Sequence, residues 1–194
     1  MPRAAQAPGL SQGLAPLWRE DAELLLLGSF PGQASLAARQ YYAHPRNAFW
    51  PLLGALLDEP DLPKQPYEAR LQRLVERRVA LWDAVARCVR PGSLDSRIRD
   101  AEPSALPDLV ARLPRLRAIG CNGGTAFRQA CAALPGAPWP FLALPSSSPA
   151  LASVDFEAKR QAWWALRFFL APAGHFRQPQ RAGPDCAPCP NAAR

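Results

Sequence analysis

Residues 23–32 read ELLLLGSFPG, in which four leucines, Leu24 to Leu27, run directly into Gly28 and a loop containing Pro31. A short apolar run that ends at glycine and proline is typical of a strand buried on both faces of a parallel sheet. We therefore predict a buried strand that ends near Gly28. Residues 116–121 and 140–144 have the same form and end at Asn-Gly-Gly and at proline with three serines, and a short strand is also predicted within 79–85.

Segments with helical spacing of apolar residues separate these strands. We predict helices over residues 47–57, 67–79, 125–133 and about 155–170, the last with its aromatic residues Trp163, Trp164, Phe168 and Phe169 in the core. Strands that alternate with helices indicate an α/β fold, a three-layer α/β/α sandwich with a central, mostly parallel sheet. Ligands bind beyond the carboxyl ends of such strands, so the loops 28–47 and 145–153 are expected to form the site.

The chain of 194 residues has the length of one folded domain. Residues 1–17 lack periodicity and are predicted to be a flexible arm, residues 18–171 the folded domain, and residues 172–194 a proline-rich disordered tail. No apolar run has the length of a membrane span, and the N-terminus lacks the apolar stretch of a secretory signal. We expect a cytoplasmic, nucleoid-associated protein.

The net charge is +7 and the pI about 9.7, which favours a polyanionic partner. A GC-rich coding genome would equally produce this charge, because all but two of the positive residues, Lys64 and Lys159, are arginines. Five cysteines do not suggest a disulfide framework, and Cys186 and Cys189 form a C-x-x-C pair without a second pair at zinc-ribbon spacing. We predict neither a metal nor a cofactor.

Residues 41–50, YYAHPRNAFW, follow the first predicted loop. Taken alone, this stretch predicts a turn followed by a helix that begins with aromatic residues. Asn47 is suited to cap that helix. The side-chain amide of Asn47 also both donates and accepts hydrogen bonds, so it is equally suited to bind a polar ligand. Asn47 can cap the helix and bind a ligand at the same time, so the two interpretations do not exclude each other.

These stretches closely resemble the first motif of the uracil-DNA glycosylase superfamily, in which G-I-N-P-G is followed by F-A-H-P-x-N-x-F-W. Residues 144–149, LPSSSP, resemble the second motif of the superfamily, a Ser/Pro loop that contacts the minor groove. Together with residues 92–96, GSLDS, they are similar to the hypoxanthine-DNA glycosylase family in particular. The resemblance covers about residues 22–170 and implies an enzyme that extrudes a deaminated base from double-stranded DNA into a pocket.

The resemblance also implies roles for single residues. Tyr42, rather than its neighbour Tyr41, matches the aromatic residue on which the flipped base stacks, and Asn47 matches a residue that would bind the base and stabilise its departure. Phe30 and Gly32 are expected to belong to the base-binding residues. Phe30 stands where related branches have Asp or Asn and cannot form hydrogen bonds, so water is expected to be held by backbone groups near Gly32 and by Asn47. His44 is expected either to contact the base or a phosphate, or to brace the loop.

In the second motif, Ser146, Ser147 and Ser148 are expected to contact phosphates. Pro149, Ala150 and Leu151 are suited to fill the gap that the flipped base leaves. No role follows for Asp95 and Ser96. Because Lys64 lies outside every motif and Lys159 is expected to be exposed in the last helix, we predict a monofunctional hydrolase that uses water as the nucleophile and acts as a monomer.

Three alternatives remain at this point. The first is a uracil or mixed-specificity glycosylase of the same fold, and the second is a binder of damaged DNA without catalytic activity. The third, an unrelated small-molecule hydrolase, would need a nucleophile with a base, and the predicted folded domain has one histidine, His44, and no G-x-S-x-G sequence.

Overall fold

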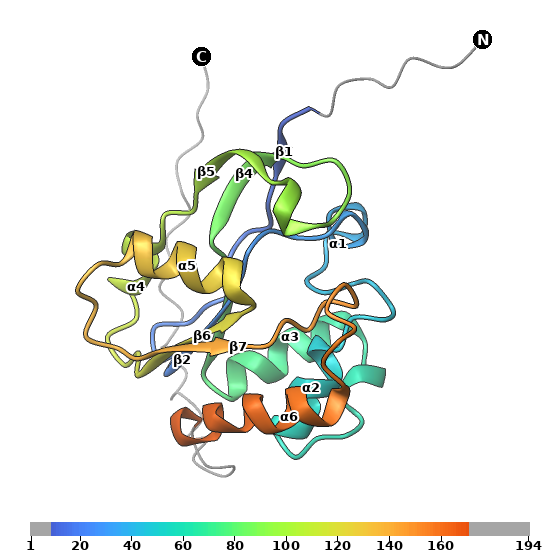
Figure 1. The fold of residues 1–194 in the computed structure, drawn as a ribbon. Helices are drawn as coiled ribbons and strands as arrows, with labels where there is room; N and C mark the ends of the chain where they lie inside the picture. Colours follow the sequence, from blue (N-terminus) through green and yellow to red (C-terminus); the bar gives the residue numbers. More distant parts are fainter. Residues whose placement is uncertain (1–8, 171–194) are drawn as a thin grey trace, which may run out of the picture.

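The computed structural model describes residues 9–170. Its centre is a sheet of parallel strands in the order β3 (Val79–Asp83), β2 (Leu24–Gly28), β6 (Ala118–Asn122) and β7 (Phe141–Leu144) (Figure 1). All five residues of β2 are buried. Successive side chains of a strand point to opposite faces, so Leu24 and Leu26 pack on one side of the sheet and Leu25 and Leu27 on the other.

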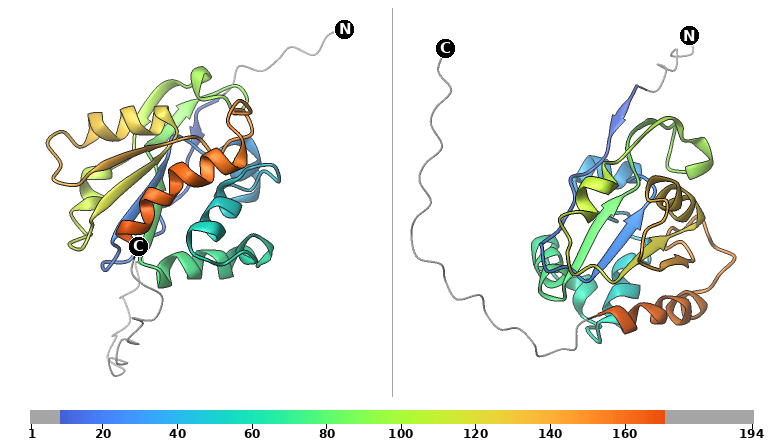
Figure 2. Two further views of the ribbon diagram at one scale, coloured as in Figure 1. Left: turned by 60° about the horizontal axis from the view of Figure 1, so that its bottom comes forward. Right: turned by 90° about the vertical axis from the view of Figure 1, so that its left-hand side faces the viewer.

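Each face of this sheet is covered by helices (Figures 1 and 2). On the side of Leu24 lie α2 (Phe49–Leu56), α3 (Tyr67–Glu76) and α6 (Phe156–Trp163), with the short 3-10 segments η1 (Leu62–Lys64) and η3 (Trp164–Phe169). On the side of Leu25 lie α4 (Leu106–Val110) and α5 (Gly124–Ala133). The predicted three-layer α/β/α sandwich with a mostly parallel sheet is confirmed.

A second, antiparallel sheet extends the molecule beyond β3. It has the order β1 (Ser11–Gln12), β4 (Val85–Val89) and β5 (Arg99–Pro103), and it encloses a small core around Phe30, Val85 and Cys88. Between its strands β4 and β5, the loop with η2 (Asp95–Arg97) reaches toward α1 (Gln33–Ala38), which follows β2 (Figure 1). The sequence did not predict this sheet.

The prediction of a flexible arm over residues 1–17 is wrong for its second half. Gly13 donates a backbone hydrogen bond to Ala86, and Leu17 and Leu81 exchange a pair of them, because the chain runs antiparallel along strands that would otherwise be edges. Residues 1–8 lie outside the described part of the chain, as does the predicted tail, residues 172–194, with Cys186 and Cys189.

The predicted last helix is shorter than expected and only partly buried. α6 ends at Trp163, which is buried, and η3 continues to Phe169. Phe168 is 82% exposed and Trp164 is 41% exposed, with the guanidinium of Arg167 over its ring, so the expectation that all four aromatic residues belong to the core is wrong for these two. No helix within residues 9–170 has the length and apolar character needed to cross a membrane.

Candidate active site

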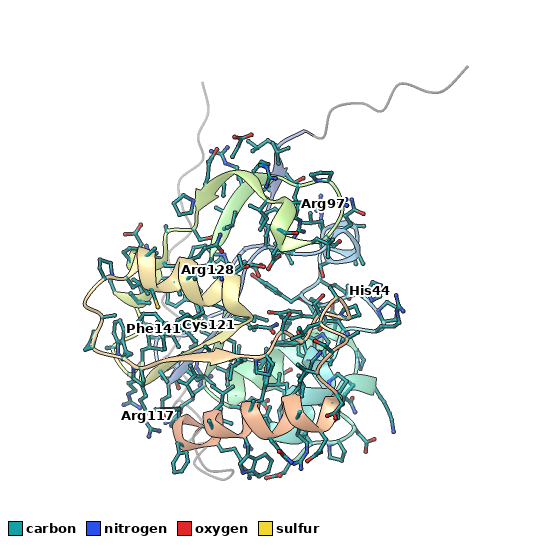
Figure 3. All side chains as sticks on the ribbon, in the orientation of Figure 1. His44, Arg97, Arg117, Cys121, Arg128 and Phe141 are labelled. Carbon is teal, nitrogen blue, oxygen red and sulfur yellow. The ribbon has the colours of Figure 1, made fainter. Side chains whose placement is uncertain are left out.

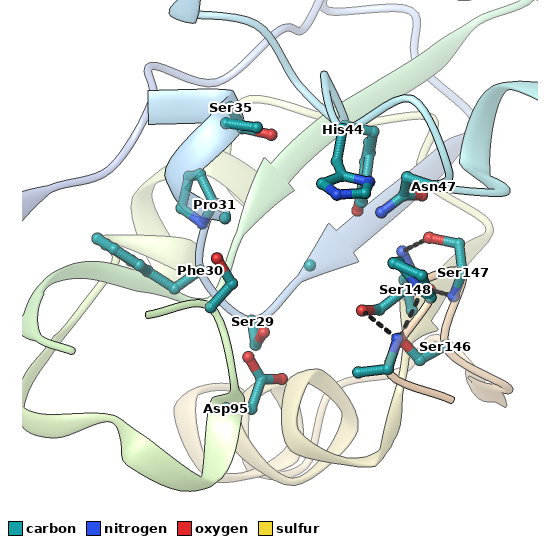
Figure 4. A pocket seen from close by; sticks show the side chains of 18 of the residues that line it. Ser29, Phe30, Pro31, Ser35, His44, Asn47, Asp95, Ser146, Ser147 and Ser148 are labelled. Carbon is teal, nitrogen blue, oxygen red and sulfur yellow. Dashed lines mark hydrogen bonds between the residues drawn. The ribbon is translucent and has the colours of Figure 1, made fainter. Parts of the chain in front are cut away.

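A cavity of about 320 Å³ lies beyond the carboxyl ends of the parallel strands. The loops 28–47 and 145–153 both contribute to its wall, as predicted, and the ends of β3 and β6 and the loop before η2 complete it (Figure 4). Small-molecule sites in proteins have volumes of about 300–1,000 Å³, so a single base is a suitable occupant in size. Its lining includes Gly28, Ser29, Phe30, Pro31, Gly32, Tyr42, His44, Asn47, Asp83, Leu94, Asp95, Asn122, Ser146, Ser147, Ser148, Pro149 and Leu151.

Asn47 lies at the start of α2 and lines the cavity beside His44 (Figure 4). Its Oδ1 accepts a hydrogen bond of 2.9 Å from the backbone N–H of Phe49, the first residue of the helix. Because only the oxygen of the amide can accept this bond, the Nδ2 group remains available as a donor. Asn47 therefore ties down the helix start and lines the cavity at the same time, which joins the two interpretations of its sequence position.

Tyr42 lines the cavity and packs against the core with one face of its ring. The ring stacks on Phe49 at a centroid distance of 3.7 Å and an interplanar angle of 12°. Tyr41 also lines the cavity, but it is 5% exposed and donates its hydroxyl proton to the carbonyl of Ala15, 3.0 Å away. The geometry supports Tyr42 over Tyr41 as the platform for a stacked ligand, because Phe49 holds the ring of Tyr42 from behind.

His44 and Gly32 also line the cavity. The Nδ1 of His44 accepts a hydrogen bond of 3.2 Å from the backbone N–H of Arg46, so in the neutral ring the proton lies on Nε2. Gly32 precedes α1 and its carbonyl accepts from Leu36. The roles of His44 in base or phosphate binding and of Gly32 in holding water stay predictions.

Phe30 lines the cavity, but its ring packs in the small core. It is 5% exposed, packs in the small core with Val85 and Cys88, and points away from His44 and Asn47 (Figure 4). The guanidinium of Arg90 lies 5.0 Å from the centre of the Phe30 ring on that side. Phe30 was expected to bind the base, and this stays a prediction: the residue lines the cavity, while its ring packs in an apolar site of the antiparallel sheet that the sequence did not reveal.

The Ser/Pro loop after β7 is held by the end of β6. Asn122 donates from Nδ2 to the Ser147 hydroxyl and accepts from the Ser147 backbone N–H, each at 2.8 Å, and Ser147 is 1% exposed. The predicted phosphate contact of Ser147 stays a prediction; in the structure its hydroxyl is enclosed and bonded to Asn122. The hydroxyls of Ser146 and Ser148 accept backbone N–H groups within the loop and keep their own protons to donate.

Lys159 is buried, although its position between Glu157 and Arg160 predicted exposure. It is 5% exposed and its Nζ donates a hydrogen bond of 2.9 Å to the carbonyl of Leu151, the last cavity-lining residue of the loop. Burial lowers the pKa of the Lys159 ammonium. The lysine thus supports the Ser/Pro loop from α6, while its own side chain is not part of the cavity wall.

The GSLDS stretch supports the first loop. The carboxylate of Asp95 lies 3.5 Å from the guanidinium of Arg90, a buried side chain that donates to the carbonyls of Phe30 and Pro31. The Ser93 hydroxyl accepts from the backbone N–H of Gln33 at 3.0 Å. These contacts give the stretch a structural role between η2 and the first loop, whereas Ser96 is exposed and contributes only its carbonyl, to Arg99.

The sequence analysis missed several cavity residues, among them Asp83. Asp83 is the last residue of β3 and is 4% exposed. Burial, together with the nearby Asp95, raises the pKa of its carboxyl to about 7, although Arg90 acts in the opposite direction. An acidic residue directly after an apolar strand, at the edge where ligands bind, was the available signal.

Several arginines near the cavity form no ion pair with another residue in the described range 9–170. Arg46 lies between the cavity residues His44 and Asn47, Arg97 lies in η2 with the cavity residue Asp95, and Arg128 lies on α5; Figure 3 labels Arg97, Arg128 and His44. Unpaired guanidinium groups are suited to bind phosphates. Groups of three or more side chains suited to hold a metal do not occur within residues 9–170.

Comparisons with known proteins agree with this geometry. A family model described as the Uracil DNA glycosylase superfamily matches residues 16–167. A hypoxanthine DNA glycosylase of Methanosarcina acetivorans is 35% identical over 159 residues, which are 82% of this chain and 98% of the relative, and one of Methanosarcina barkeri is 39% identical over 112 residues, 58% of this chain and 70% of the relative.

A solved structure has the same fold. The solution NMR structure of a candidate uracil DNA glycosylase from Methanosarcina acetivorans superimposes on this chain with a TM-score of 0.73 at 34% identity. The superposition covers 82% of this chain and 97% of the solved chain. The matched region includes both loops that form the cavity, with Tyr42 and Asn47 on the first of them. From its sequence, its sheet and its cavity, the chain belongs to the uracil DNA glycosylase superfamily.

Proposed function

We propose that this protein is a monofunctional DNA glycosylase that removes hypoxanthine from deoxyinosine in duplex DNA. The observation that carries the proposal is the pairing of Tyr42 and Asn47 in one cavity of about 320 Å³, a stacking surface beside a fixed amide donor. The relatives named hypoxanthine DNA glycosylase support this choice of base.

The reaction begins when the damaged nucleotide leaves the base stack and its base enters the cavity. The base stacks on the free face of Tyr42, which Phe49 holds in place. As the bond between the base and the sugar breaks, negative charge accumulates on the base, and the Nδ2 group of Asn47 donates a hydrogen bond to it. Such a donor acts most strongly in an enclosed site from which water is excluded.

Water is the proposed nucleophile, and no cofactor is required for this reaction. Phe30 cannot position the water, because its ring lies in the small core. Backbone groups of the first loop near Gly32 face the cavity and are the proposed binding site of the water. Hydrolysis leaves an intact strand with an abasic sugar.

Contacts to the DNA backbone come from the rim of the cavity. Ser146 and Ser148 have free hydroxyl protons, and Arg46 carries an unpaired charge among the described residues. Pro149 and Leu151 lie on the cavity wall of the same loop, from which they can fill the gap in the duplex. We place the protein in the cytoplasm, at the nucleoid, where it acts as a monomer.

The test is a single-turnover assay on duplexes of one sequence that contain a single inosine, uracil or xanthine. Cleavage of inosine DNA, seen as strand breaks only after alkali, supports the proposal. Preferential cleavage of uracil would assign the enzyme to the alternative specificity. Tight binding of inosine DNA with no cleavage of any of the three would identify a non-catalytic binder of damaged DNA.

A further inference from the structure

Asp83 is placed so that its carboxyl group forms part of the cavity floor. Its backbone is in register with Gly28 at the end of the neighbouring strand β2. A Cβ added at position 28 would collide with the Asp83 Oδ1, and it would lie 3.1 Å from the Tyr42 hydroxyl. Gly28 therefore leaves room for the Asp83 carboxyl, which lies across the end of β2 toward the hydroxyl end of Tyr42.

Part of the hydrogen-bonding capacity of this region of the cavity is not used within the protein. The Asp83 Oδ2 is enclosed and has no hydrogen-bond partner within residues 9–170. The Tyr42 hydroxyl is also enclosed, and Asn122 is the side chain that acts on it as a hydrogen-bonding neighbour. A buried polar atom without a partner is costly, and such atoms are rare in folded proteins. At a cavity floor, they indicate that a bound ligand supplies the missing partner.

The surroundings of Asp83 disfavour its charged form. Asp95 and the hydroxyl groups of Tyr41, Tyr42 and Tyr67 interact with it electrostatically, and His44 lines the same cavity. The cation that acts on Asp83, Arg90, is engaged by Asp95 and by the carbonyls of the first loop.

Burial raises the pKa of Asp83 to about 7, so near neutral pH much of it is a neutral carboxylic acid. A neutral carboxyl has one O–H donor beside one carbonyl acceptor.

We propose that Asp83, as a neutral acid, binds the edge of the flipped base. The inference rests on the proposed glycosylase function. Hypoxanthine presents a ring N–H beside a carbonyl oxygen, and the acid can accept from the first and donate to the second. Uracil and xanthine offer the same pair of groups. Stacking on Tyr42 directs one edge of the base toward Asp83, because Asp83 lies at the hydroxyl end of that ring.

The donated hydrogen bond also assists the reaction. The departing base carries negative charge that is shared by its carbonyl oxygen, so a donor at this oxygen is stronger in the transition state than in the ground state. An ionised Asp83 would instead repel this charge. The neutral acid thus adds to the donor of Asn47, and its loss at alkaline pH should slow cleavage.

The test compares the wild type with Asp83→Asn and Asp83→Ala in single-turnover cleavage of inosine duplex between pH 6 and pH 9. The wild-type rate should fall as pH rises above about 7, approaching tenfold for each pH unit. Asp83→Ala should be at least about 30-fold slower at pH 6. Asp83→Asn keeps a donor and an acceptor but cannot ionise, so it should restore most of the activity and remove the alkaline decline.

Stability provides a readout that is independent of activity. Because the pKa of Asp83 is about 7 in the folded protein and about 3.8 when unfolded, the folded state retains a proton that the unfolded chain loses between these values. The contribution of Asp83 to stability therefore decreases as pH rises from about 4 to 7. The melting temperature of Asp83→Asn relative to the wild type should increase over this range.

The matched control is Asp108→Asn, an exposed carboxyl on α4, which should leave both the rate and its pH dependence unchanged. The inference is overturned if Asp83→Asn is as slow as Asp83→Ala, if Asp83→Ala matches the wild type, or if the wild-type rate rises or stays constant through pH 9. A wild type that cleaves no inosine DNA at pH 6 would refute the proposed function instead, so the two failures are distinguishable.

Discussion

Replacement of Asn47 separates its two roles, because they use different atoms of one side chain. The Oδ1 atom accepts from the Phe49 backbone at 2.9 Å, and the Nδ2 group is left for the ligand. Asn47→Asp keeps an acceptor for Phe49 but removes the donor, whereas Asn47→Ala removes both. A comparison of the two variants therefore measures the contribution of the Nδ2 donor to catalysis separately from the contribution of Oδ1 to the stability of the helix start.

The expected magnitudes differ widely. Removal of one preorganised donor from an enclosed site slows catalysis by about 100- to 1,000-fold, or about 2.7–4 kcal/mol. Loss of the side-chain bond at a helix start costs only about 1 kcal/mol of stability, which is about 2–4 °C in melting temperature for a domain of this size. Since folded domains have about 5–15 kcal/mol of stability, the Ala variant should remain folded at 25 °C.

The assay is single-turnover cleavage of inosine duplex with enzyme in excess, beside a thermal melt and a binding titration on the same duplex. We expect both variants to cleave at least about 100-fold more slowly than the wild type, only Asn47→Ala to melt earlier, and both to retain duplex binding. Asn191→Ala, outside the described residues, is the matched control for an asparagine change. If Asn47→Asp cleaved within a few fold of the wild type, the amide donor would have no part in catalysis.

Three further predictions concern the DNA interface and the nucleophile. Arg46→Ala should reduce the slope of log affinity against log salt by about 1, and Arg115→Ala, at the opposite edge of the sheet, should leave the slope unchanged; equal slopes would remove Arg46 from the interface. Leu151→Ala should slow cleavage of inosine duplex by about tenfold but leave cleavage of single-stranded inosine DNA unchanged, and an equal loss on both substrates would contradict a wedge role. Borohydride added during cleavage should trap no covalent protein–DNA complex, because the Lys159 amine is bonded to Leu151 beneath the loop and Lys64 is paired with exposed Asp61; a trapped complex that disappears in Lys159→Ala would identify an amine nucleophile.

The central sheet could be predicted from the sequence because its strands are continuous apolar runs. β2 is buried at all five positions, so burial alone explains its composition. The antiparallel sheet lacks such a signal: β1 has two residues, and β5 reads RDAEP and is largely exposed. These strands form through pairing with β4, a contact that no local pattern of residues encodes. The burial of the Phe30 ring follows from this sheet and was missed with it.

The cavity residues also differ in whether their placement can be predicted from the sequence. Asn47 and His44 are oriented by backbone N–H groups two residues further along the chain. Their placement depends on a short segment, and a short segment can be recognised as a motif. Lys159 and Asp83 are defined by distant partners, Leu151 in one case and Gly28 with Tyr42 in the other. The charged residues that flank Lys159 predicted that it is exposed. It is buried because α6 packs under the Ser/Pro loop.

The orientation of these side chains bears directly on catalysis. Asn47, His44 and Asn122 each use one polar atom to hold a backbone group, at 2.9, 3.2 and 2.8 Å. Two of these bonds determine which atoms can bind the ligand, because they leave Nδ2 of Asn47 and Nε2 of His44 as donors. Donors that are already oriented need no reorganisation when charge develops on the departing base, which is the condition under which they stabilise a transition state most. Asp83 differs from them because its Oδ2 has no partner in the described part of the protein, so it is the group whose hydrogen bonding must change most when the base arrives. A pH-dependent step in this enzyme is therefore expected at Asp83 rather than at the two asparagines, which do not titrate.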